Sequence, residues 1–326
     1  MKEKLKPMEW CFMGCLGFED RFITAVDQAK SSFTLNDIFF LKVTDEDSVH
    51  SICIEEIYEE HTNQLNDALD NNFRIKELAL LESPRLLKDE VKRFLDVSCP
   101  NILLDISCFP KRFFFPILKL MLNSDQVQNL VVCYTLPQSY SKIGLAEDTL
   151  PWSHIPMFKQ TEIKVSKKEK AIVGVGFMPY ELPSLLKDDY PKAEINFVFP
   201  FPPGPPNYQR SWEFVRSIEK NYTVREGDSR IIRVDIKDVS RCYDHLLTIS
   251  DTGNHSCVIA PYGPKTHSLA MALFASNFDC DVVYTQPRYY NPRYTTGVKY
   301  INGDPETYLY LIKSEGKNLY TTNQPS

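Results

Sequence analysis

The sequence predicts an α/β protein built from two tandem lobes, each with a mainly parallel sheet, and a C-terminal antiparallel hairpin. Short apolar runs alternate with helical patterns along most of the 326 residues, and this alternation is typical of parallel sheets covered by helices. A second observation is that one strand–turn–helix unit occurs twice. A third is that the two halves begin and end alike.

The repeated unit is clearest in residues 101–122, which read NILLDISCFPKRFFFPILKLML. An apolar run is followed there by a polar turn and then by a helical segment. Residues 256–275 repeat this order, and the dipeptide Pro-Lys falls at the same point of both units, at 110–111 and 264–265. A strand, a turn and a helix in this order form one βα unit of a parallel sheet.

The beginnings and ends of the halves correspond as well. Residues 13–18 read MGCLGF and residues 173–177 read VGVGF, each at the end of an apolar run. Residues 131–137 read VVCYTLP and residues 282–287 read VVYTQP. Three markers in the same order predict an internal duplication.

In the first half, strands are expected over 10–15, 37–43, 74–81, 102–104 and 130–135, and helices over 19–29, 47–69, 85–96 and 113–122. The prolines and weak periodicity of the next segment break this rhythm. We therefore expect an N-terminal lobe of residues 1–140 and a linker of residues 141–170.

The second half repeats the scheme in a C-terminal lobe of residues 171–315. Strands are expected over 171–175, 195–199, 230–234 and 256–260 and from Val282, and helices over 182–186, 208–220, 239–250 and 266–275. The prolines of residues 200–206 exclude a helix or a central strand. Residues 297–300 and 307–312 predict the antiparallel hairpin, and the polar residues 316–326 a flexible tail.

The composition excludes several classes of protein. No apolar run is long enough to span a bilayer and the first nine residues have no apolar signal core, so we expect a cytoplasmic protein. The net charge of −6 argues against general nucleic-acid binding. Nine cysteines without a Cys-x-x-Cys pair indicate reduced thiols, and six scattered histidines form no metal-ligand pattern, so we expect no metal and no cofactor.

The turns that follow the strands carry the candidate binding residues. Ligands bind at the carboxyl edge of open α/β sheets, and the first N–H groups of a helix favour an anion. A hydroxyl and two cations follow residues 102–104 at such a position, so an anionic ligand is expected. The candidates are Gly17, Glu19, Arg21, Asp105, Ser107, Lys111, Arg112, Gly176, Tyr262, Gly263, Lys265, Gln286 and Tyr289.

Alternative interpretations stay open for several of these residues. Glu19 and Arg21 are equally well explained as a helix-start pair. The tyrosines and arginines of residues 286–294 suit stacking on bases and binding of phosphates, or they pack as an aromatic-rich loop over the sheet. Asp105, Ser107 and Lys111 could act together, with Lys111 stabilising a phosphoryl oxygen, although the sequence has no G-x-S-x-G, P-loop or metalloprotease motif.

The turn Asp105-x-Ser107-x-x-Pro110-Lys111-Arg112 after a central strand resembles the ligand-binding turn of CRISPR-associated Rossmann-fold (CARF) sensor domains. These domains carry a hydroxyl residue, a small turn and a Lys or Arg at this point. Two such lobes in one chain resemble the SAVED sensors, which look like two fused CARF units. The sequence departs from the pattern at Cys108-Phe109, where the family usually has glycine, and it carries no attached nuclease or helix-turn-helix effector.

The resemblance implies two Rossmann-like lobes that bind a nucleotide or cyclic oligonucleotide in the cleft between them. The chain would then be the sensing subunit of a bacterial antiviral defence system and would regulate a separately encoded effector protein. Two alternatives remain: a phosphodiesterase or other nucleotide hydrolase on the same scaffold, because some CARF proteins cleave their ligands, and a structural subunit that binds a partner protein.

Overall fold

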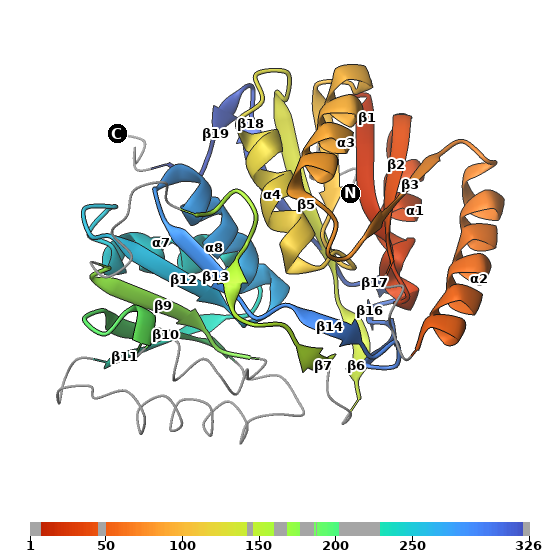
Figure 1. Ribbon diagram of the computed structural model, residues 1–326. Helices are drawn as coiled ribbons and strands as arrows, with labels where there is room; N and C mark the ends of the chain where they lie inside the picture. The colour runs from red at the N-terminus through yellow and green to blue at the C-terminus, as the bar shows by residue number, and fades with distance from the viewer. Residues whose placement is uncertain are drawn as a thin grey trace. The chain divides into compact units, whose positions relative to one another are not determined.

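The chain divides into two compact units, each built around an α/β sheet. The first unit comprises Met1–Asp148 and Arg288–Leu319, and the second comprises Thr149–Pro287 and Tyr320–Ser326. Mainly parallel sheets in both units confirm the predicted fold class (Figure 1). The computed structural model describes residues 8–44, 50–141, 146–159, 168–176, 186, 188–201 and 229–321.

The described part of the first unit contains a seven-stranded sheet with the order β19-β18-β5-β4-β1-β2-β3. Strands β1 to β5 are parallel, and β18 joins β5 in the antiparallel direction. The chain order therefore reverses between β1 and β4, which makes that point a topological switch point. The strands are β1 (Trp10–Leu16), β2 (Leu35–Thr44), β3 (Arg74–Ala79), β4 (Asn101–Asp105), β5 (Asn129–Thr135), β18 (Thr307–Ser314) and β19 (Lys317–Asn318).

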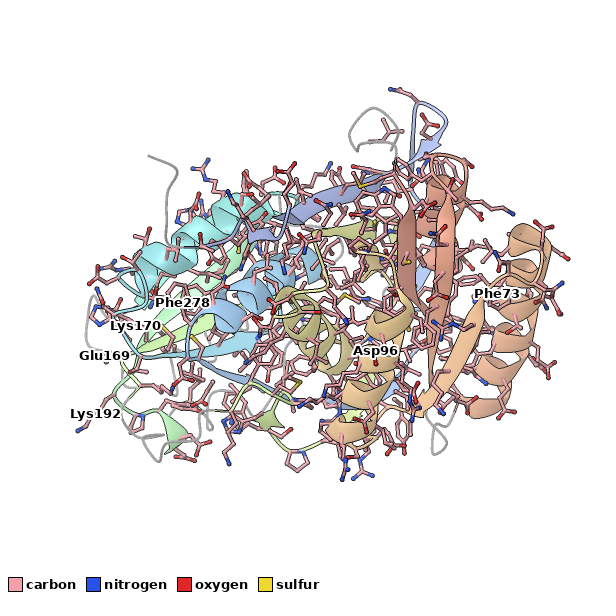
Figure 2. The ribbon with its side chains drawn as sticks, turned by 90° about the horizontal axis from the view of Figure 1, so that it is seen from above. Phe73, Asp96, Glu169, Lys170, Lys192 and Phe278 are labelled. Atoms are coloured by element: carbon pink, nitrogen blue, oxygen red, sulfur yellow. The ribbon has the colours of Figure 1, made fainter. Side chains whose placement is uncertain are left out.

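Helices cover both faces of this sheet because successive strand side chains point to opposite faces. Phe12 and Phe40 share a core with apolar residues of α1 and α2, whereas Phe39 stacks on Phe94 of α3 on the other face. Phe73, labelled in Figure 2, precedes β3 and packs edge-on against Phe40. The helical segments are η1 (Asp20–Phe22), α1 (Thr24–Lys30), α2 (Ser51–Leu69), α3 (Pro84–Val97) and α4 (Lys111–Leu122), so the helix expected over 19–29 is divided into η1 and α1.

The second unit repeats the strand order of the first. Its described sheet has the order β11-β10-β9-β12-β13-β8, in which β9 to β13 are parallel and β8 is antiparallel to β13. In chain order both sheets read 3-2-1-4-5, with an antiparallel strand beside the fifth. The strands are β8 (Ser153–His154), β9 (Lys170–Gly174), β10 (Glu194–Phe201), β11 (Ser229–Asp235), β12 (Cys257–Pro261) and β13 (Asp281–Tyr284).

The helices repeat as well. α7 (Val239–Ile249) and α8 (Lys265–Asn277) follow the third and fourth strands of the second sheet, as α3 and α4 do in the first. Lys111 and Lys265 are the first residues of α4 and α8, and each follows a proline at the N-cap. The two Pro-Lys turns therefore occupy equivalent positions in the two units, as the sequence predicts.

Short-range signals explain where several helices begin and end. The Ser83 hydroxyl accepts a hydrogen bond from the N–H of Arg85, the second residue of α3, and Pro84 occupies the first helical position. The Asp238 carboxylate caps α7 by accepting the N–H of Arg241, the third residue of that helix. α2 ends at Asp70, whose φ of 54° lies in the left-handed region.

The C-terminal strands belong to a different unit from the one expected. We expected a hairpin of residues 297–300 and 307–312 within a lobe of residues 171–315. Instead, β18 pairs with β5, and Leu309 packs against the core of the first unit. Antiparallel hairpins join β18 to β19 and β16 (Tyr300–Ile301) to β17 (Asp304–Pro305), whereas β15 (Thr295–Val298) pairs with β6 (Pro137–Tyr140). The expected C-terminal antiparallel hairpin is confirmed as a kind of element, whereas the pairing of residues 297–300 with 307–312 is wrong, because a pattern along the chain favours neighbouring segments as partners.

Residues 316–321 of the expected flexible tail are paired or packed, and residues 322–326 lie outside the described residues. β19 pairs with β18, and Tyr320 is 9% exposed. The Tyr320 ring centroid lies 5.1 Å from that of Tyr243, and the Tyr243 hydroxyl donates to the Tyr320 carbonyl at 2.9 Å. The aromatic side chain of Tyr320 therefore anchors this segment.

The expected linker of residues 141–170 contributes strands. β7 (Ala146–Thr149) pairs with β14 (Pro287–Tyr290), β8 pairs with β13, and the boundary between the units falls after Asp148. Strands of two to four residues leave no periodic pattern in a sequence. The expected helices 182–186 and 208–220 and the proline-rich loop 200–206 lie wholly or largely outside the described residues. Within the described residues, no helix is both long and apolar enough to cross a membrane.

Candidate functional site

A pocket lies at the carboxyl edge of the first sheet, beside the switch point. It holds about 430 Å³ of empty space, including space open to solvent. The ends of β1, β2 and β3 line it together with α2 and the turn between β4 and α4, which is where ligands bind in open α/β sheets. The lining residues are Cys15, Gly17, Phe18, Val43, Thr44, Ile54, Tyr58, Leu80, Cys108, Pro110 and Tyr290.

The walls of this pocket are mainly apolar and partly aromatic. The rings of Phe18 and Tyr290 have centroids 6.5 Å apart and are tilted by 38°. Tyr58 donates a hydrogen bond to the Val43 carbonyl at 2.8 Å, and Lys42 Nζ lies 5.1 Å from the centroid of the Tyr58 ring. Walls of this kind suit a flat, largely apolar group.

Gly17 brings two loops together at the pocket. A Cβ atom at this position would lie 2.8 Å from the Cβ of Cys108, so only glycine fits without a shift. The Gly17 carbonyl oxygen lies 2.8 Å from His61 Nδ1, which therefore carries the proton of this hydrogen bond. Burial lowers the pKa of His61, whose ring stacks on Phe22 at 4.1 Å. Gly17 thus permits the close approach of the loop after β1 to the turn that carries Cys108.

Glu19 and Arg21 form a buried ion pair that holds loops together. Arg21 Nη2 lies 2.7 Å from Glu19 Oε2, with side-chain exposures of 5% and 14%. Arg21 Nη1 also donates to the Thr135 carbonyl at 2.8 Å, and its guanidinium lies 5.4 Å from the centroid of the Tyr134 ring. The Thr295 hydroxyl donates to Glu19. This geometry favours the structural interpretation of the pair.

Asp105 and Ser107 belong to a buried chain of hydrogen bonds. The Ser107 hydroxyl donates to Asp105 Oδ1 at 2.5 Å, and the Ser107 N–H donates to the same oxygen at 2.9 Å. Ser107 Oγ accepts the N–H of Thr135 at 2.8 Å. Asp105 and Ser107 are 2% and 0% exposed, so the chain fixes the end of β4 to the end of β5.

Tyr262 makes the corresponding connection in the second unit. Its hydroxyl accepts the N–H of Thr285 at 3.0 Å and lies 2.6 Å from the Thr285 hydroxyl. The Tyr262 ring is 1% exposed and stacks on Tyr284 with centroids 5.2 Å apart. In both units, therefore, a hydroxyl from the turn after the fourth strand binds the N–H of the Tyr-Thr pair that ends the fifth.

The other candidates of the second unit are tightly packed. A Cβ at Gly176 would lie 2.6 Å from the Tyr262 carbonyl oxygen, and one at Gly263 would lie 3.4 Å from the Val175 carbonyl oxygen. The loop after β9 therefore touches the turn after β12. Gln286 is 3% exposed, and its Nε2 donates to the Pro287 carbonyl at 2.9 Å.

The candidate cations lie at the first turns of helices. Lys111 and Lys265 are partly exposed, and neither α4 nor α8 has an acidic residue in its first turn. Arg112 is also partly exposed and its Nη2 lies 3.5 Å from the Glu82 carbonyl. Burial lowers the pKa of Arg112, which stays cationic because a guanidinium does not deprotonate near neutral pH.

The first unit brings some of the predicted residues to one place. Gly17 lines the pocket, Lys111 and Arg112 directly follow its Pro110, and Tyr289 directly precedes its Tyr290. Sequence reasoning missed the wall formed by β2, β3 and α2. The signal that was available is that three neighbouring strands end at this edge of the sheet.

Comparison with known proteins does not assign the chain to a family. No protein-family model matches the chain. No curated protein matches it. Among solved structures it is similar to a Pseudomonas aeruginosa UCBPP-PA14 protein provisionally assigned as a universal stress protein, with 12% identity, coverage of 85% of this chain and 93% of that chain, and a TM-score of 0.27. A protein of unknown function from Pseudomonas aeruginosa PAO1 has 12% identity, coverage of 85% and 92%, and a TM-score of 0.26.

Likeness at these TM-scores supports no functional argument. The classification rests on the strand order, which is 3-2-1-4-5 in both units. The chain is an α/β protein with two Rossmann-type units.

Proposed function

We propose that this chain is a nucleotide sensor whose first unit binds the base in its apolar pocket and the phosphate beside α4. The observation that carries the proposal is the pocket at the carboxyl edge of the sheet, next to the switch point. In line with the resemblance to CARF and SAVED domains, we propose a cytoplasmic sensing subunit of a bacterial antiviral defence system that regulates a separate effector. Its ligand is a nucleotide or cyclic oligonucleotide.

The pocket walls support binding of a base. Phe18, Tyr58 and Tyr290 contribute aromatic rings, and Ile54 and Leu80 contribute apolar side chains. Stacking of a base on an aromatic side chain is worth about 1–3 kcal/mol and tolerates any base. The lining therefore favours a base over a sugar or a compact inorganic anion.

The residues that follow the pocket support binding of the phosphate. Lys111 and Arg112 come directly after Pro110, and α4 begins without a capping carboxylate. The positive end of the helix and the two cations attract the same negative charge. A nucleotide with its base in the pocket would present its phosphate toward this turn.

Burial of the hydroxyl favours binding without turnover. Ser107 Oγ donates to Asp105 and accepts from the Thr135 N–H, and both Asp105 and Ser107 are almost fully buried. A nucleophile must reach the reacting atom, and a general base must reach the proton that it removes. The two side chains that the hydrolase alternative requires are instead committed to holding β4 and β5 together.

Calorimetric titration with AMP, ATP and a cyclic diadenylate tests the proposal. We expect at least one of them to bind and to be recovered intact by mass spectrometry. Lys111→Ala should weaken this binding by roughly one to two decades, because a charge-assisted hydrogen bond is worth about 1.5–3 kcal/mol. Lys88→Ala, which removes an exposed lysine of α3, is the matched control and should bind as the wild type does.

Three outcomes would contradict this proposal. Absence of binding to all three nucleotides would contradict the site. Equal affinity of the wild type and Lys111→Ala would contradict the role of the α4 turn. Cleavage that is lost in Ser107→Ala would establish the hydrolase instead.

A further inference from the structure

Two cysteine side chains face each other at the amino edge of the first sheet. Cys11 lies on β1, and Cys99 lies in the turn between α3 and β4, three residues after Asp96, which Figure 2 labels on α3. Their Sγ atoms are 2.8 Å apart. Non-bonded heavy atoms usually lie about 3.5–4.0 Å apart, and an S–S bond is about 2.05 Å long. A small side-chain movement would therefore suffice to join the two sulfurs.

The backbone around the pair holds it in this arrangement. The Cys99 N–H donates to Cys11 Sγ at 3.0 Å. Asn101 Nδ2 donates to the Glu9 carbonyl at 2.9 Å, and Asn129 Nδ2 donates to Asn101 Oδ1 at 2.6 Å. The first two contacts fix the turn before β4 against the start of β1, and the third ties the start of β4 to the start of β5, so the approach of the two sulfurs is built into the sheet edge.

The two thiols differ in accessibility and in protonation. Cys11 is 0% exposed, whereas Cys99 is partly exposed. The hydrogen bond with the Cys99 side chain lowers the pKa of Cys11 to about 7, with help from the Cys99 N–H and against the effect of burial. The lowered pKa of Cys11 favours a thiolate beside a thiol, which is the state that reacts with oxidants.

We propose that Cys11 and Cys99 form a reversible disulfide, which makes the amino edge of the first sheet a site of oxidative modification. This site lies at the opposite edge of the sheet from the pocket, and it does not depend on the proposed nucleotide binding. Disulfides in reducing compartments are usually transient and serve redox sensing. The oxidant is a hydroperoxide, for which hydrogen peroxide serves as the probe.

The reaction balances in two steps. The Cys99 sulfur attacks one peroxide oxygen while its proton passes to the Cys11 thiolate, so an S–O bond forms, the O–O bond breaks and hydroxide leaves. The Cys11 sulfur then attacks the Cys99 sulfenic acid, so the S–S bond forms, the S–O bond breaks and water leaves with the thiol proton. Two sulfurs lose two electrons in total, and one peroxide is reduced. A dithiol reverses the change by exchange.

The disulfide would join β1 to the turn that leads into β4, and these two strands flank the switch point. The cysteines are 88 positions apart, so the bond closes a long loop. A cross-link over a long loop restricts the unfolded chain and stabilises the folded one. We therefore expect the oxidised protein to melt at a higher temperature than the reduced protein, by roughly 5–15 °C.

The test treats the reduced full-length protein with hydrogen peroxide, blocks the remaining thiols and maps the peptides by mass spectrometry. The expected result is a Cys11–Cys99 cross-linked peptide and a raised Tm, both reversed by dithiothreitol. Cys99→Ser should lose the cross-link and the Tm shift. Cys53→Ser removes another partly exposed thiol, on α2, and should retain both.

Other products would overturn the proposal. One is oxidation of Cys99 to a sulfinic acid while Cys11 stays free. Another is cross-linking confined to Cys257 and Cys280, the mutually hydrogen-bonded and almost fully buried pair of the second unit. If Cys99→Ser fails to fold, Cys99→Ala takes its place. The peptide map of the wild type decides by itself whether the Cys11–Cys99 bond forms, so the test does not depend on either variant.

Discussion

His267 is an uncharged histidine inside the second unit. It lies in the first turn of α8, is 0% exposed, and has its Nε2 3.2 Å from the Asp235 carbonyl. Burial lowers the pKa of His267 to about 4, because the charged ring cannot be hydrated there. The burial follows from the packing of the first turn of α8 against the end of β11.

His267 should make the protein sensitive to mild acid. An unfolded histidine has a pKa near 6.5, so between pH 6.5 and 4 the unfolded state binds more protons than the folded state. The neutral ring therefore contributes fully to the free energy of unfolding above pH 6.5, and this contribution decreases as the pH falls. At pH 4.5 the free energy of unfolding should be about 2–3 kcal/mol lower than at pH 7. Urea unfolding at pH 7 and pH 4.5 measures this loss. In His267→Gln the decrease in the free energy of unfolding between pH 7 and pH 4.5 should be smaller by about 2–3 kcal/mol. An unchanged decrease would contradict the role of His267 as the acid-sensitive group.

At the scale of elements, the turn after the fourth strand has the same structural task in both units. In one unit Ser107 Oγ accepts the N–H of Thr135, the last residue of β5, and in the other the Tyr262 hydroxyl accepts the N–H of Thr285, the residue directly after β13. The acceptor is the hydroxyl of a serine in the first unit and of a tyrosine in the second. The shared feature is therefore the position of an oxygen acceptor, which the sequence pattern alone does not reveal.

Removal of this acceptor should cost stability in either unit. Tyr262→Phe keeps the ring and leaves the buried Thr285 N–H without its hydroxyl partner, so we expect a loss of about 1–3 kcal/mol in the free energy of unfolding. Denaturant titration measures it. Tyr300→Phe is the matched control because Tyr300 is 59% exposed, and it should cost almost nothing. Equal losses in the two variants would show that the Tyr262 hydroxyl does not support the turn.

Elements with strong local patterns could be predicted from the sequence, and pairings between distant segments could not. The apolar runs of β1, β4, β5, β9 and β12 and their equivalent turns follow from periodicity and from the repeated Pro-Lys dipeptide. The pairing of β18 with β5 could not be predicted in this way, because the pairing of strands far apart in the sequence depends on contacts across the fold. The pocket wall contributed by α2 was missed for the same reason, since Ile54 and Tyr58 carry no signal beyond amphipathicity.

At the scale of the whole molecule, the charge distribution limits what the proposed site accepts. The chain carries a net charge of −6, with Lys111 and Arg112 together at the α4 turn. A net negative surface repels long polyanions, whereas a small anion needs only the local cations. The expected ligand is therefore small and compact compared with a nucleic acid, in agreement with a nucleotide.

This distribution predicts selective binding of small anions. A fluorescent nucleotide should bind, whereas a labelled 30-nucleotide single strand should bind at least roughly tenfold more weakly at the same ionic strength, because its additional phosphates meet a repulsive surface. Fluorescence anisotropy measures both. Lys111→Glu should abolish nucleotide binding, and Lys88→Glu, which changes the net charge equally on exposed α3, should retain it. If both charge reversals weaken the nucleotide to the same extent, the attraction comes from the net charge and the α4 turn has no specific part in it.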